Sequence, residues 1–221
     1  MRVLVVLLVA LFGGAGCKSK GLPSVSVSSA DTAAGRFWRW FEANAKDLRA
    51  EPDLQKTMER ISEALAKEHK GVFAEIGSDG SDRLLVLSVD GDKKLFPMVE
   101  QLYAVRPKVP GWKLVAFRQR DASLSTIEMN GRKLEPKAMK FIAERHGALF
   151  DVTVYVPGFT TADDFGNILF IALDHVVGEY DMETRIGGIE WAKLEAAPAT
   201  ARPLADLPKL IDETFPRTTA P

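Results

Sequence analysis

The chain has 221 residues, and its 29 basic and 30 acidic side chains give a formal net charge of −1 at pH 7. This balance, without a block of like charge, argues against a nucleic-acid partner, which requires a basic excess on one face. Hydrophobic residues make up 46% of the chain and its one cysteine has no disulfide partner, so an ordinary core must hold the fold together.

The amino end combines a positive start, an apolar run and small residues. Arg2 precedes the apolar residues 3–12, and the small residues 14–16 lead to Cys17. The apolar run is shorter than the ~20 residues that span a bilayer. The pattern therefore predicts a secretory signal peptide over residues 1–16.

The small residues before Cys17 resemble the lipobox of bacterial lipoproteins, although Gly14 stands where that family usually has leucine. In the family the cysteine sulfur receives a diacylglyceryl group and becomes the first mature residue. The resemblance implies lipidation at Cys17 and a membrane partner bound through the lipid, since each buried methylene contributes about 0.8 kcal/mol. Lys18 follows the cysteine, which by analogy with enterobacterial sorting favours the outer membrane, facing the periplasm. A plain signal peptide with an incidental thiol remains the alternative.

The remaining chain divides by composition into three parts. Residues 17–35 are rich in Ser, Ala, Gly and Lys and cannot bury enough apolar surface to order themselves, so we expect a flexible tether there. A tether of ~17 residues reaches roughly 20–25 Å, close to the bilayer. We expect a single α+β domain over residues 36–195. Residues 196–221 form an Ala-, Pro- and Thr-rich tail, within which a short docked helix is expected.

Two helices open the folded part. Phe37, Phe41 and Leu48 recur on one face of the first, which predicts that this face is buried. Residues 54–70 carry the cleanest amphipathic pattern in the chain and predict the second helix.

After Gly71, apolar side chains recur at every second position, which is the period of a β-strand. Residues 72–78 and 83–89 read as a hairpin, followed by a helix near residues 97–106 and a strand from Trp112. A second tight turn at Asn130-Gly131 precedes KAMKFIAERHG, which reads as a helix closed by Gly147. The order strand–strand–helix thus occurs twice in the prediction, as a quasi-repeat or as shared turn chemistry.

The second half of the chain is predicted to contribute one strand, one helix and a last strand. LFDVTVYV, residues 149–156, alternates apolar and polar side chains, so Phe150, Val152, Val154 and Val156 should face the core. A helix follows and ends at Gly178. Together, the predicted elements make an α+β two-layer domain with about six mostly antiparallel strands and about five helices.

The densest polar stretch is LDHVVGEYDMET, residues 173–184. His175 and Glu179 are four residues apart and could bridge a metal on a continuous helix, but Gly178 is expected to end that helix between them. Glu75 interrupts an apolar strand, so it either faces solvent or is buried with a partner. Glu75, Asp174 and Glu179 could form an acid–base or metal site if they converge. Otherwise they pair with Arg or Lys as structural ion pairs.

No nucleophile elbow, Walker loop, dinucleotide fingerprint or Cys-x-x-Cys motif occurs in the sequence, and no cofactor is expected. FWRWF, PGW and LDHVVGEYD together resemble bacterial domains of unassigned function, a resemblance that implies a compact α+β module and no catalytic residue. We therefore predict a membrane-tethered, non-catalytic binding or scaffold module of the cell envelope, with an envelope protein as the expected partner. The alternative is a hydrolase or metal-dependent enzyme built on the carboxylate and histidine residues named above.

Overall fold

The computed structural model describes residues 32–121, 126–129, 131–160 and 165–216, and the predicted signal peptide and Cys17 lie outside these ranges. The described helices are α1 (Ala33–Ala50), α2 (Leu54–Glu68), α3 (Phe96–Ala104), α4 (Phe165–Val177), α5 (Glu179–Arg185) and α6 (Leu207–Thr214). The described strands are β1 (Phe73–Asp79), β2 (Asp82–Ser88), β3 (Trp112–Ala116), β4 (Ile127–Met129), β5 (Arg132–Leu134), β6 (Lys140–His146), β7 (Leu149–Val156), β8 (Ile186–Lys193) and β9 (Arg202–Pro203).

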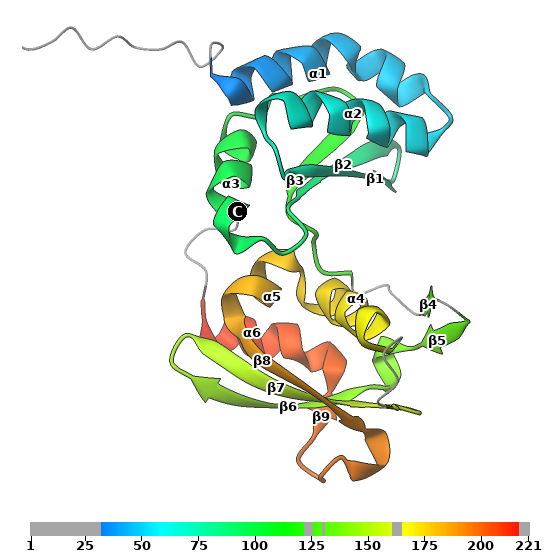
Figure 1. Cartoon of the computed structure of the whole chain (residues 1–221), viewed down its shortest axis with the longest axis vertical. Coiled ribbons are helices and arrows are strands. Elements are labelled where there is room, and N and C mark those ends of the chain that lie inside the picture. The colour runs from blue at the N-terminus through cyan, green and yellow to red at the C-terminus, as the bar shows by residue number, and fades with distance from the viewer. Residues whose placement is uncertain (1–31, 122–125, 130, 161–164, 217–221) are drawn as a thin grey trace, which may run out of the picture.

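The strands form three small sheets, ordered β1-β2-β3, β4-β5 and β8-β7-β6-β9. Among the described residues, four of the six strand pairs are antiparallel, and the pairs β2 with β3 and β7 with β8 are parallel. The predicted α+β class with mostly antiparallel strands is therefore confirmed. In Figure 1, α1 and α2 cover the first sheet, and α4, α5 and α6 lie between it and the sheet that contains β6 to β8.

The two larger sheets share one topology. In the first half of the described chain, the hairpin β1-β2 leads through α3 to β3, which pairs parallel to β2. In the second half, the hairpin β6-β7 leads through α4 and α5 to β8, which pairs parallel to β7. A strand–strand–helix order thus occurs twice, but its second copy lies at β6, β7 and α4.

The helix predicted over KAMKFIAERHG is wrong. Residues 140–146 form β6, which pairs antiparallel with β7 from Lys140↔Tyr155 to His146↔Leu149. Gly147, with φ 64°, belongs to the turn of this hairpin and does not end a helix. The pairing with β7 outweighs the helix propensity of Ala, Met, Lys and Glu in the segment.

The first half has its own aromatic core. Phe41 is fully buried and meets the Trp112 ring edge to face at 5.0 Å between centroids. The indole N–H of Trp112 donates to the Ala45 carbonyl, and that of Trp38 donates to the Leu102 carbonyl. Each large apolar side chain buried here contributes on the order of 2–3 kcal/mol, which confirms the predicted packing role of the α1 aromatics.

The second half is built around β7 and α4. Val152 and Val154 of β7 pack with Ile168 of α4 in a separate cluster of buried residues. Leu207 and Ile211 of α6 belong to the same cluster, so this helix of the 196–221 segment is docked on the second core. None of the described helices combines the length and apolar character that a membrane span requires.

Candidate functional site

Arg118 lies where the two halves meet. It directly follows Phe117, whose φ of 61° turns the chain sharply just after β3. Its guanidinium Nη1 lies 3.0 Å from Glu75 Oε1 and 3.0 Å from Asp90 Oδ1, and its Nε lies 2.9 Å from Asp174 Oδ2. One arginine therefore ties two carboxylates of the first half to one of the second.

Glu179 completes this arrangement from the first residue of α5. Its side chain is buried, with 1% of the residue exposed. Oε1 accepts hydrogen bonds from Ser88 Oγ at 3.0 Å, Val89 N at 3.0 Å and Gly91 N at 3.3 Å, and Oε2 accepts one from Arg118 N at 3.0 Å. Four donors from the first half thus satisfy a buried charge of the second. We call Glu75, Asp90, Arg118, Asp174 and Glu179 the Arg118 cluster.

The structure brings together the three carboxylates on which the enzyme hypothesis rested. Burial raises the pKa of Glu75, an effect that Arg118 partly offsets and that Glu179 then reinforces. Burial likewise raises the pKa of Asp174, again against the pull of Arg118. The pKa of neighbouring Glu183 is raised by burial and by repulsion from Asp174 and Glu179. The cluster therefore holds several negative charges around one guanidinium.

A second arginine repeats this bridging two residues further along the chain. Arg120 Nη2 lies 2.6 Å from Asp181 Oδ2, and its Nη1 and Nη2 form a bidentate pair with Asp212 of α6 at 2.7 and 2.9 Å. Its Nε donates to the Val177 carbonyl at the end of α4. Arg120 therefore anchors the connection between the halves to α4, α5 and α6.

Aromatic side chains also pack where the two halves meet, next to the Arg118 cluster. The Tyr180 ring, next to Glu179 on α5, stacks on Phe96 with centroids 5.6 Å apart and contacts Phe117 at 5.4 Å. Phe96 and Phe117 belong to the first core. The start of α5 thus inserts an anion and an aromatic ring into the first half of the molecule.

His175 lies on α4 beside the Arg118 cluster. With Asp90, Asp174 and Glu183 it lines a cavity of about 230 Å³. As predicted, Gly178 separates His175 from Glu179: α4 ends at Val177 and Gly178 has φ 84°. Within the described ranges, no group of three or more His, Cys, Asp or Glu side chains is arranged to hold a metal ion.

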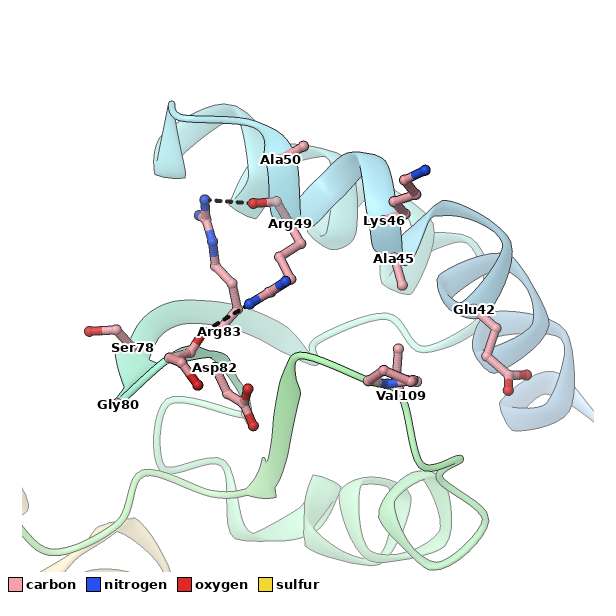
Figure 2. A pocket seen from close by; sticks show the side chains of 12 residues that line it. Glu42, Ala45, Lys46, Arg49, Ala50, Ser78, Gly80, Asp82, Arg83 and Val109 are labelled. Atoms are coloured by element: carbon pink, nitrogen blue, oxygen red, sulfur yellow. Dashed lines mark hydrogen bonds between the residues drawn. The ribbon is translucent and has the colours of Figure 1, made fainter.

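A larger cavity, of about 740 Å³, lies at the end of the first half that is opposite to the Arg118 cluster. It is lined by α1, the β1–β2 turn and the segment before β3. Figure 2 shows Arg49 and Arg83 side by side at its wall, one from α1 and one from β2. Lys46 lies one helical turn before Arg49 on α1, and Figure 2 shows its ammonium pointing away from the Arg49 guanidinium. We call this cavity the α1 cavity.

The anionic side of the junction was predictable from the sequence, whereas Arg118 and Arg120 were not among the predicted site residues. Both stand in AFRQR, at the end of a predicted strand and two residues apart. Their spacing was the available signal, because a strand end that carries two arginines on the same side can serve two acidic partners. The remaining donors to Glu179 are mainly backbone amides, which leave no mark in a sequence.

Comparison with known proteins adds no assignment. No protein-family model, curated protein or solved structure matches the chain.

Proposed function

We propose that the protein is a non-catalytic binding or scaffold module of the cell envelope, tethered to a membrane through lipid on Cys17. The observation that supports the non-catalytic role is the environment of Glu179. Its carboxylate is buried and accepts from Ser88, Val89, Gly91 and Arg118, so its oxygens face donors of the chain. A carboxylate used in this way positions the two halves and is not free to exchange protons with a substrate.

The lipobox-like sequence supports the tether. Cys17→Ser should move the protein from the membrane fraction to the soluble exported fraction, because the acyl chains supply the membrane affinity. Fractionation of cells labelled with a radioactive fatty acid measures both the lipid and the location. Ser19→Ala serves as the control and should stay labelled and membrane-bound. A mature protein that starts elsewhere and carries no label would contradict the tether.

The non-catalytic role has its own test in Asp174→Asn, which keeps the shape of the side chain and removes its charge beside Arg118. We expect full complementation of a deletion strain whenever the variant accumulates to the normal amount, whatever the change in its melting temperature. Asp47→Asn, at an exposed position of α1, is the matched control. A stable, abundant and membrane-bound Asp174→Asn that fails to complement would contradict this role.

That contrary outcome would favour the alternative, a hydrolase or metal-dependent enzyme using Glu75, Asp174, His175 and Glu179. One observation favours it: Asp174 and His175 line the cavity of about 230 Å³. Burial also raises the pKa of Glu75 and Asp174, as in many acid–base groups. Hydrolysis of small ester or peptide substrates, lost in Asp174→Asn, is the activity to measure.

A further inference from the structure

The α1 cavity contains basic side chains that form no ion pair within the part of the chain that the structure describes. Among the described residues, no carboxylate lies within 4.0 Å of the side-chain nitrogens of Lys46, Arg49 or Arg83. Arg118 and Arg120, in contrast, contact three and two carboxylates. The arginines at the junction are therefore paired with carboxylates, whereas among the described residues Lys46, Arg49 and Arg83 form no ion pair.

The guanidinium groups of Arg49 and Arg83 are held in place by hydrogen bonds to backbone carbonyls. Arg83 Nη2 donates to the carbonyls of Arg49 and Glu51 at the end of α1, at 3.0 and 2.7 Å. Arg49 Nη2 donates to the Ser81 carbonyl at 3.0 Å, and both contacts with Arg49 are drawn in Figure 2. A fixed fork of N–H donors matches the oxygens of a carboxylate or phosphate and loses little entropy on binding.

The Arg49 guanidinium can occupy its position because residue 111 is a glycine. Gly111 lies against the Arg49 side chain, and a Cβ at this position would come within 2.5 Å of Arg49 Nε. Arg83 Nη1 is buried and has no hydrogen-bond partner among the described atoms. This N–H group keeps its positive charge inside the wall of the cavity, where a neighbouring anion is electrostatically favourable.

The remaining walls of the α1 cavity indicate a ligand larger than a bare ion. Ala45, Val109 and Pro110 supply apolar surface, and Ser78 and Ser81 supply polar side chains. A volume of about 740 Å³ is in the range of small-molecule sites. Glu42 and Asp82 also line it, so three cations face two anions and the local excess is one positive charge.

We propose that the α1 cavity binds a small organic anion, whose carboxylate or phosphate head lies against the Arg49 guanidinium and whose apolar body packs on Val109 and Pro110. The inference deepens the proposed binding role, on which it rests, by naming a ligand class. Arg83 acts as a positioning residue, because it fixes the end of α1 that carries Arg49.

The test is a titration of the purified full-length protein in detergent with inorganic phosphate and, separately, with acetate. Chloride keeps the ionic strength constant, and the backbone amide signals of Gly80, Ser81 and Gly111 report binding in NMR spectra. We expect saturable shifts at these amides with at least one of the two anions. Phosphate alone would assign a phosphate head, and acetate alone a carboxylate head.

Variants separate this site from general charge effects. Arg49→Gln should weaken the affinity by about tenfold, the loss expected for one charge-assisted hydrogen bond. Lys46→Gln should also weaken it by removing a nearby positive charge, and Lys46 is exposed on α1. Arg39→Gln, at an exposed position of the same helix, is the matched control and should bind normally.

Two results would overturn the proposal: no saturable shift with either anion, or equal weakening in Arg39→Gln and Arg49→Gln. Failure of the proposed function remains distinguishable, because Asp174→Asn alters the Arg118 cluster and should leave this titration unchanged. An activity that depends on Asp174 would therefore refute the non-catalytic role without affecting the anion site.

Discussion

The ionised carboxylate of Glu183 carries a free-energy cost of burial that the neighbouring residues do not remove. Its carboxylate lies over Gly91, where a Cβ would come within 2.9 Å of Oε1. Burial raises its pKa, Asp174 and Glu179 raise it further, and Lys93 only partly offsets them. Because the folded protein disfavours the ionised form, the charge of Glu183 destabilises the fold wherever the unfolded chain is ionised.

Glu183→Gln should therefore stabilise the protein at pH 7, by about 0.5 kcal/mol after allowance for solvent screening. The gain should shrink as the pH falls through the raised pKa of Glu183. It should vanish below the pKa of an unfolded glutamate, about 4.3, where both states bind the proton. Urea unfolding of both proteins between pH 7 and pH 4 measures this difference.

Glu100→Gln is the control for this pH series, since Glu100 is exposed on α3. It should change the stability little at any pH. A gain for Glu183→Gln that persists at pH 4 would show that packing, and not charge, is responsible.

Gly178 forms the joint between α4 and α5. Its φ of 84° is left-handed, and a Cβ there would lie 3.3 Å from the Arg118 carbonyl oxygen and from Arg120 N. The Glu179 amide donates to the same Arg118 carbonyl at 3.0 Å. The joint therefore lets α5 approach the backbone that connects the two halves, which brings Glu179 to its four donors.

Gly178→Ala should destabilise the protein by about 2 kcal/mol, because the left-handed backbone costs about 1–2 kcal/mol for a residue with a Cβ and the contacts are tight. Gly80→Ala is the matched control: its φ is 61°, and its added Cβ would meet nothing within 4 Å. Thermal unfolding of both variants measures the two losses. Equal losses would mean that the approach to Arg118 carries no penalty.

The helices and strands with a clear hydrophobic period were predictable from the sequence, and β6 and α5 were not. KAMKFIAERHG is rich in helix formers and ends in glycine, and a helix end and a hairpin turn both use glycine with positive φ. Only the long pairing with β7 decides between them. Residues 179–185 are too short for a reliable helical period, and their position is set by contacts with Arg118 and Arg120.

The molecule as a whole consists of two cores joined by a polar and aromatic interface. Glu75 could be suspected from the sequence because it interrupts an apolar strand, and Asp174 and Glu179 because they lie in the densest polar stretch of the chain. Their meeting point could not, since Arg118 joins them from segments 43 and 61 residues away. Backbone donors at Val89 complete the site, and only the fold places them. The interface, then, is a product of the tertiary structure, and its strength determines whether the halves unfold together.

Glu179→Ala should weaken this coupling. It leaves Ser88 Oγ and the amides of Val89 and Arg118 without their acceptor, and unsatisfied buried donors cost on the order of 1–3 kcal/mol each. We expect a loss of about 3 kcal/mol and a separation of unfolding into two steps. Hydrogen exchange in urea, followed separately for α2 and β7, measures the stability of each core.

Leu65→Ala is the control that separates coupling from stability. Leu65 is fully buried in the first core and away from the interface, and its truncation should cost about 2–5 kcal/mol. Because the contacts of Glu179 remain, α2 and β7 should still lose protection at the same urea concentration. In Glu179→Ala the two should separate, since each core then unfolds with its own free energy. A single shared transition in Glu179→Ala would mean that the stacking of Tyr180 on Phe96 is sufficient to couple the halves.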